Sequence, residues 1–245
     1  ELRLLPVVSQ PEGGPWLEML WQLCWHLQRL GYPVVVLDGT AQESASSPGL
    51  IHLLQRAPWN DGVDLNMGAM ASSLAVIPAA QGLQLLPRQG RPGASPLASL
   101  LPYFRTYGLL VLHAPAATLG PLLQHTATTP LVVMGTGAAG VMTSYKSLKQ
   151  IALDTGLPCM VAALLHGSGA AERRKTQHAL HTLQDCAERH LGGPVRTTTI
   201  ATQNPQDLQR LALQLLENAG TITDSPSVLP SRNLTGTPAY FAPRH

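Results

Sequence analysis

Short apolar runs alternate with longer amphipathic segments along most of the chain. Continuous runs of this kind, without intervening polar residues, indicate strands that are covered on both faces. The strands expected from such runs are Leu4–Val8, Pro33–Leu37, Leu109–Leu112, Leu131–Met134 and Pro158–Leu165, and the more polar segment Val195–Ile200 is expected as a late strand. Strands and helices that alternate in this way predict an α/β fold with a mostly parallel, doubly wound sheet flanked by helices.

Helical periodicity fills most of the segments between these strands. The expected helices are Trp16–Leu30, Leu50–Arg56, Leu97–Tyr107, Val141–Thr155, Ala170–His190 and Pro205–Asn218. Gly31 is expected to end the first helix and Asn204 to cap the last one. Two further short strands, Leu74–Pro78 and Leu83–Pro87, are expected to form a hairpin across residues 79–82.

The length and composition indicate one domain with a neutral surface. The 245 residues suffice for a full core, and we expect a single domain over residues 1–220 with an irregular, proline-rich tail over residues 221–245. Only 12% of the residues are charged, whereas 44% are hydrophobic. Neutral surfaces favour association, so protein partners or self-association are expected.

The net charge of +2 is spread along the chain apart from Arg173–Lys175. This distribution argues against a dominant nucleic-acid-binding face, and no nucleic acid is expected as a partner. The basic triplet is interpreted as a solvated helix face, with a phosphate or lipid headgroup as the alternative ligand.

Three widely spaced cysteines, Cys24, Cys159 and Cys186, predict reduced thiols in a cytoplasmic protein. Neither a membrane-spanning run nor a signal peptide is expected from the pattern of apolar residues. Because the chain opens at Glu1 instead of methionine, we expect further residues to precede it in the natural protein.

The turn after the first strand has the plan of a phosphate-binding loop without its charged groups. An apolar strand, a Gly/Pro turn and a helix opening near Pro15 are the local elements that P-loop proteins use to hold a phosphate on backbone N–H groups. A working loop also needs a lysine and a Ser/Thr hydroxyl for Mg²⁺, but no lysine precedes Lys146. This turn is therefore interpreted first as an ordinary β–α connection of the fold.

Four phrases of the chain resemble the MinD/ParA group of deviant P-loop ATPases, and within it the flagellar-number regulators of the FlhG (FleN) type. They are Leu30-Gly31, Val36-Leu37-Asp38-Gly39-Thr40, Tyr107-Gly108-Leu109-Leu110-Val111-Leu112-His113-Ala114-Pro115-Ala116 and Thr143-Ser144-Tyr145-Lys146-Ser147-Leu148-Lys149. The resemblance implies a P-loop NTPase-like fold of the SIMIBI type that extends to about residue 218.

The same resemblance implies that the nucleotide motifs are degenerate. Counted back from Leu30-Gly31, the family's two loop lysines fall on Pro11 and Trp16, and its Mg²⁺-ligating Thr falls on Leu17. The degenerate phosphate-loop positions are Pro11, Gly13, Gly14, Pro15, Trp16 and Leu17. Asp38 retains the first acidic residue, whereas His113 replaces the Mg²⁺-associated Asp, so these two form the residual candidate site.

The resemblance favours a MinD/FlhG-like regulatory or scaffold protein that has lost ATP hydrolysis, a pseudo-ATPase with a role in flagellar number or placement. No catalytic residue, metal or cofactor is expected; ATP and Mg²⁺ remain as an alternative without support from the motifs. A second hypothesis is a dimerising switch that still binds ATP or ADP through Lys146 or Lys149. A third is another α/β enzyme with a pocket beside residues 135–140.

Three further features have two interpretations each. The apolar helix with Trp16, Trp21 and Trp25 is interpreted as buried, with a protein-binding patch as the alternative. Asp38 is interpreted as a strand-end turn residue before any chemical role. The closing helix Pro205–Asn218 is expected to pack on the sheet, and peripheral membrane contact is the weaker alternative.

Overall fold

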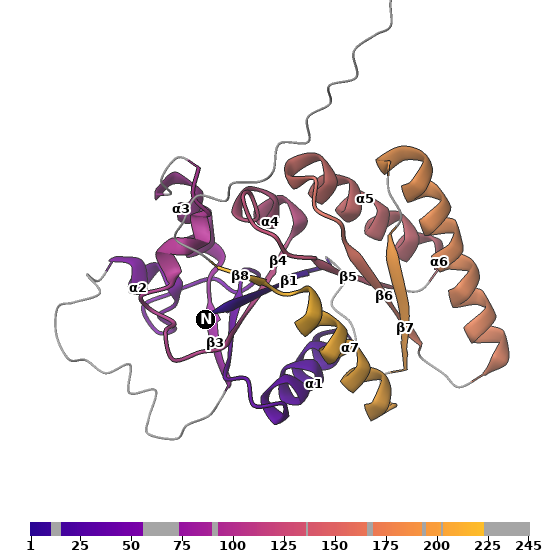
Figure 1. The fold of residues 1–245 in the computed structure, drawn as a ribbon, viewed down its shortest axis with the longest axis horizontal. Coiled ribbons are helices and arrows are strands. Elements are labelled where there is room, and N and C mark those ends of the chain that lie inside the picture. Colours follow the sequence, from indigo (N-terminus) through magenta and orange to yellow (C-terminus); the bar gives the residue numbers. More distant parts are fainter. Residues whose placement is uncertain are drawn as a thin grey trace, which may run out of the picture.

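The computed structural model of the chain describes residues 1–10, 16–55, 74–89, 93–135, 137–165, 169–192, 195–201 and 203–222. Eight strands form one sheet in the order β3-β2-β4-β1-β5-β6-β7, and the short β8 pairs antiparallel with β1 (Figure 1). All other pairs are parallel. The strands are β1 Arg3–Val8, β2 Val34–Asp38, β3 Leu74–Pro78, β4 Leu109–Ala114, β5 Leu131–Met134, β6 Met160–Leu165, β7 Arg196–Ala201 and β8 Gly220–Thr221.

Helices cover both faces of this sheet, so the predicted doubly wound α/β fold is confirmed (Figure 1). The helices are α1 Trp16–Arg29, α2 Leu50–Gln55, α3 Ala80–Gln89, α4 Ala116–Leu122, α5 Gly137–Thr155, α6 Ala170–Leu191 and α7 Pro205–Asn218. On one face α1 and α7 pack side by side, and on the other α3, α4, α5 and α6 follow one another. Gly31, with φ of +90°, ends α1 as expected.

Two apolar clusters form the core, one on each face of the sheet. Successive residues of a strand point to opposite faces, so Leu4 joins one cluster and Leu5 the other. The apolar side of α7 lies buried with α1 against the sheet, which confirms the expected packing of the closing helix. Burial also raises the pKa of the Cys24 and Cys159 thiols to about 12, as expected for core residues.

Two predicted elements are wrong. The expected strand Leu83–Pro87 belongs to helix α3, because Ala79, Ala80, Leu83 and Leu86 are buried at helical spacing over the sheet. The expected helix over residues 97–107 is reduced to a 3-10 turn, Pro96–Leu100, capped by Ser95. Pro102 lacks the N–H that would continue a helix, so the chain turns instead.

Two elements were not foreseen. Helix α4 is only seven residues long and contains Pro121, so its sequence lacks a clear helical pattern. Strand β8 is two residues long and depends on a neighbour far away in sequence, β1. Directly after β8, the N–H of Ile222 donates to the carbonyl of Leu2, and the Ile222 side chain is buried. Packed chain therefore extends to Ile222.

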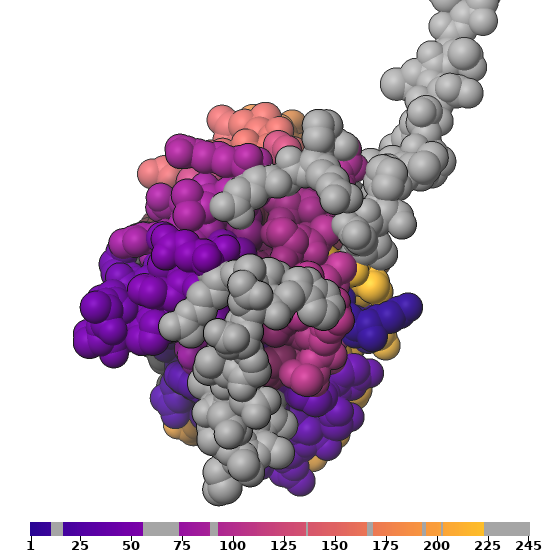
Figure 2. Space-filling view, turned by 90° about the vertical axis from the view of Figure 1, so that its left-hand side faces the viewer, coloured from indigo at the N-terminus to yellow at the C-terminus, as the bar shows by residue number. Residues whose placement is uncertain are grey.

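A buried carboxylate joins two helices at the β3 edge of the sheet. The Glu43 side chain is 7% exposed and accepts hydrogen bonds from the backbone N–H groups of Gln81 at 2.7 Å, Gly82 at 2.8 Å and Ile51 at 3.4 Å. These N–H groups lie in the first turns of α3 and α2, where a helix has no internal acceptor for them. The two helices lie side by side on the surface at this edge (Figure 2).

Within the described ranges, no helix has both the length and the apolar character needed to cross a membrane.

Candidate functional site

Strand order brings Asp38 and His113 together at the carboxyl ends of the central strands, and Ser9 follows the neighbouring strand β1. Because β4 lies between β1 and β2, Asp38 at the end of β2 is the register partner of His113 on β4, and His113 is also the register partner of Val7 on β1. Ser9, directly after β1, is buried, and its N–H donates to the carbonyl of Ala114. Ligands of doubly wound proteins bind at this end of the sheet.

Asp38 and His113 form a hydrogen-bonded pair. The His113 Nδ1 atom lies 3.1 Å from Asp38 Oδ1, and His113 is only 1% exposed. Burial by itself would raise the pKa of Asp38. The hydrogen bonds from His113 and Thr40 have the larger combined effect and lower the pKa from its ordinary value of 3.8 to about 2. Since the ionised carboxylate can only accept, His113 donates through Nδ1–H.

The same oxygen of Asp38 also holds the following turn. The backbone N–H of Thr40 donates to Asp38 Oδ1 at 2.9 Å, and the Thr40 hydroxyl donates at 2.6 Å. Such a contact to the residue two positions on is an Asx turn. A Cβ atom on the intervening Gly39 would stand 2.7 Å from the Ala114 Cβ, so only glycine fits there. Asp38 therefore has the turn role expected from the sequence.

Leu17 lies in the first turn of α1, where the resemblance places a Mg²⁺-ligating hydroxyl. The side chain is 43% exposed and offers no polar atom. Trp16 opens the helix. The predicted loop positions Pro11, Gly13, Gly14 and Pro15 lie outside the described residues.

The described residues Asp38, His113 and Leu17 do not fit a magnesium–nucleotide site of the P-loop kind. One oxygen of Asp38 is committed to three hydrogen bonds, and a Nδ1–H donor stands where a second carboxylate would be needed. Mg²⁺ prefers carboxylate and hydroxyl oxygens, and a donor N–H beside the carboxylate competes with the cation for it. As arranged, the pair stabilises the strand ends.

Lys146 and Lys149 lie on the exposed side of α5. Lys146 is nine residues into this helix, or about 13 Å along its axis from the end that adjoins β5. Its neighbour Ser144 is fully buried, and its hydroxyl has no hydrogen-bond partner among the described residues. The structure thus brings Asp38 and His113 together, whereas it places the two lysines on the surface of a flanking helix.

A groove of about 660 Å³ runs between α5 and α6 beside Gly137. Its walls are mainly apolar and include Val141, Met142 and Tyr145, with His178 opposite. Gly135, at the strand end itself, borders a cavity of only about 30 Å³. The larger groove, lined by Gly137 and Ala138, therefore lies beside residues 135–140, where the third hypothesis expects a pocket, whereas the cavity at the strand end itself is small.

The interpretation of α1 as a fully buried helix is wrong for two of its tryptophans. Trp21 and Trp25 are 50% and 52% exposed, and with Leu17 they follow one another at four-residue spacing, which forms a stripe along one side of the helix. The Arg29 guanidinium lies 4.7 Å from the centroid of the Trp25 ring. The opposite side of α1, with Met19, Leu23 and Leu27, packs into the core. The apolar side chains of the stripe therefore face outward.

Comparisons with known proteins support the fold. No protein-family model matches the chain, and no curated protein matches it either. Cobyrinic acid a,c-diamide synthase from Mycobacterium smegmatis with bound ADP and magnesium is similar in structure, with a TM-score of 0.56, 16% identity and coverage of 91% of this chain and 100% of that one.

Two other solved structures are similar over most of the chain. MinD cell division protein from Aquifex aeolicus has a TM-score of 0.53 at 11% identity and covers 90% of this chain and 99% of that one. A ParA family ATPase from Chlorobium tepidum has a TM-score of 0.52 at 14% identity, with coverage of 87% and 90%. At these identities the comparisons show a shared fold.

Proposed function

We propose that this chain is a regulatory or scaffold protein of the MinD/ParA class that binds other proteins and does not hydrolyse ATP. The Asp38–His113 pair carries the proposal. It occupies the strand ends where the resemblance places the acidic groups of the Mg²⁺ site, and it turns the surviving carboxylate into a structural acceptor. Hydrolysis in this class needs Mg²⁺, a lysine and a carboxylate that orients water, and removing one such stabiliser costs roughly 10²–10³ in rate.

The exposed stripe of Leu17, Trp21 and Trp25 supports the protein-binding part of the proposal. Tryptophans that are half exposed on one side of a helix are typical anchors of protein interfaces. The neutral composition of the chain favours association in the same way. The stripe therefore becomes the surface to test for a protein partner or for self-association in the cytoplasm.

A more specific form of the proposal is a role in the number or placement of flagella. It rests only on the resemblance of the four phrases, residues 30–31, 36–40, 107–116 and 143–149, to FlhG-type regulators. A pull-down from flagellated and non-flagellated cells, with the wild-type chain and a Trp21→Gln/Trp25→Gln variant as baits, tests it. If the captured partners are unrelated to flagella, the flagellar role is rejected, and the proposal of a protein-binding scaffold stands without it.

Calorimetric titration with ATP and ADP in the presence of Mg²⁺ tests the general proposal. We expect neither binding at millimolar nucleotide nor turnover in a phosphate-release assay. The variant Trp16→Lys/Leu17→Thr/His113→Asp restores one loop lysine, the hydroxyl and the second carboxylate, and it tests whether the scaffold can accept these groups. ATP turnover by the natural chain that disappears in Asp38→Ala would refute the proposal.

A second candidate is a nucleotide-dependent switch, favoured by the fold shared with a protein solved with ADP and magnesium. In this case Lys146 or Lys149 would supply the missing cation. Micromolar nucleotide binding that is lost in Lys146→Ala or Lys149→Ala would support the switch. Unchanged nucleotide affinity in both variants would show that neither Lys146 nor Lys149 takes the place of the loop lysine.

A further inference from the structure

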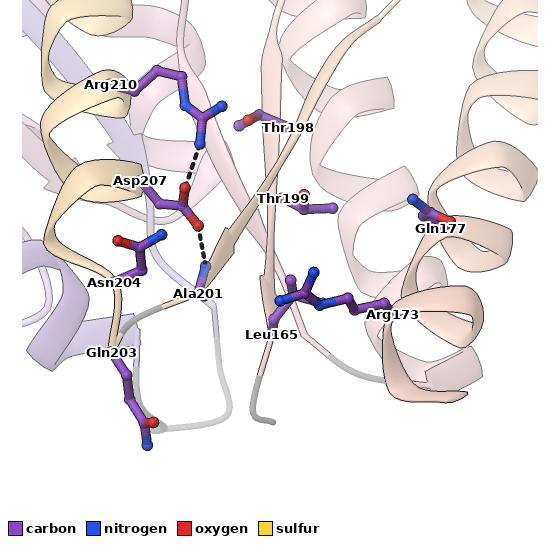
Figure 3. Close-up of a pocket in the computed structure, with 10 residues that line it drawn as sticks. All are labelled: Leu165, Arg173, Gln177, Thr198, Thr199, Ala201, Gln203, Asn204, Asp207 and Arg210. Carbon is purple, nitrogen blue, oxygen red and sulfur yellow. Dashed lines mark hydrogen bonds and ion pairs between the residues drawn. The ribbon is translucent and has the colours of Figure 1, made fainter. Parts of the chain in front are cut away.

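The outer edge of β7 lies at the bottom of a cleft between α6 and α7. Among the described strands β7 is the last at its end of the sheet, so its outer side pairs with no other strand. A cavity of about 490 Å³ lies in front of this edge, within the range of ligand-binding clefts, about 300–1,000 Å³. Thr198 and Thr199 line its floor, Arg173 and Gln177 of α6 form one wall, and Arg210 of α7 lies on the other (Figure 3).

Hydrogen bonds from neighbouring segments cap the two ends of this edge and leave its middle open. The N–H of Ala201 donates to Asp207 Oδ2 at 3.1 Å, and the carbonyl of Ala201 accepts from the N–H of Asn204 at 2.8 Å. At the other end, Gln184 Nε2 donates to the carbonyl of Val195 at 3.4 Å. The N–H and C=O groups of Ala201 and the C=O group of Val195 therefore point away from β6.

Backbone groups of a strand alternate between its two sides, so Thr197 and Thr199 share the direction of Val195 and Ala201. Their N–H and C=O groups make no hydrogen bond to a turn, cap or side chain in the described part of the chain. The open middle of the edge thus offers two donors and two acceptors in the positions that an added strand would use.

The cleft also has a charge preference. Arg173 and Arg210 approach the edge from the two opposite faces of the sheet (Figure 3). Asp207 accepts one bond from Arg210, but a guanidinium has five N–H donors, so Arg210 retains others. An extended peptide directs successive side chains to opposite faces. Two adjacent acidic residues on such a peptide would therefore meet one arginine each.

We propose that the β7 edge binds an extended peptide segment of a partner protein by strand addition, and that the segment carries acidic side chains on both faces. This assigns to Arg173, and not to the whole basic triplet, a role in recognition. The site is separated from β1 by β5 and β6, so the proposal does not depend on whether a nucleotide binds at the strand ends.

The probe is a fluorescently labelled, blocked peptide of about six residues, in which valine and threonine flank two adjacent glutamates. Anisotropy with the full chain is expected to show saturable binding. A peptide of the same composition with the glutamates two positions apart directs both to one face, and we expect it to bind about tenfold more weakly. A lysine version should not bind.

Variants distinguish recognition from general attraction. Arg173→Glu is expected to weaken binding about tenfold or more, whereas Arg174→Glu, an equal charge change at an exposed residue that does not line the cleft, should leave affinity within about twofold. N-methylation of alternate peptide bonds should abolish binding. Added peptide should also slow amide hydrogen exchange at Thr197 and Thr199.

Three results would overturn the proposal. Equal binding of the N-methylated peptide would show attraction without strand pairing. Competition by inorganic phosphate at the concentration of the peptide would identify a simple anion site. A dimer that is broken by Arg173→Glu and cannot bind the peptide would show that a second copy of the chain occupies the edge.

Discussion

Replacing Asp38 with asparagine is expected to lower the free energy of unfolding by about 2 kcal/mol at pH 7. The magnitude follows from the pKa of Asp38, which falls from its ordinary value of 3.8 to about 2 in the folded chain. Burial alone would raise this pKa, so the stabilisation comes from the hydrogen bonds that His113 and Thr40 donate to the carboxylate.

The direction of the pKa shift determines the pH range in which the Asp38 carboxylate stabilises the folded chain. Because the folded pKa lies below the unfolded one, the stabilisation is fully present above about pH 4 and is lost as pH falls toward 2. About half should remain near pH 3 and a few tenths of a kcal/mol near pH 2. The difference between the wild type and Asp38→Asn should therefore shrink on acidification.

Urea denaturation followed by far-UV circular dichroism at pH 7, 5, 3 and 2.5 measures this difference. Glu18→Gln is the matched control, because it removes one negative charge from an exposed side chain that accepts a hydrogen bond from Gln22. The control should change stability by less than about 0.5 kcal/mol at every pH. An Asp38→Asn difference of the same size at pH 7 and pH 3 would refute the linkage to this carboxylate.

Three other substitutions test features of the fold and surface. Glu43→Ala should cost about 2–3 kcal/mol in urea denaturation, because it leaves buried N–H groups in the first turns of α2 and α3 without an acceptor; Glu43→Gln, which keeps one, should cost less. Gly140→Ala should destabilise by roughly 1–3 kcal/mol, since its Cβ would lie 2.3 Å from the carbonyl oxygen of Gly135, and thermal unfolding that matches the wild type would contradict this packing. Trp21→Gln/Trp25→Gln should change stability by no more than about 1 kcal/mol yet reduce self-association or partner binding in sedimentation velocity and pull-down experiments; loss of the folded state would show that the two side chains belong to the core.

Local patterns sufficed for most elements of the sheet. The apolar runs at β2, β4, β5 and β6 have no alternation, because each strand is covered by helices on both faces, and this property is visible in a single stretch of chain. Short segments were harder to assign. The expected strand Leu83–Pro87 proved to be helix because its leucines fit either period, and contact with the sheet decided between them.

The sequence by itself determined which residues end the strands, and with them the candidates Asp38 and His113. It could not determine that the two side chains meet, since 75 positions separate them and only the insertion of β4 between β1 and β2 makes them register partners. Likewise, the periodicity of α1 predicts a helix but not which tryptophans face outward, and the composition of β7 predicts a strand but not an edge. Periodicity is a local property set by backbone geometry, whereas strand order and exposure depend on contacts between distant segments, and only the tertiary structure decides those.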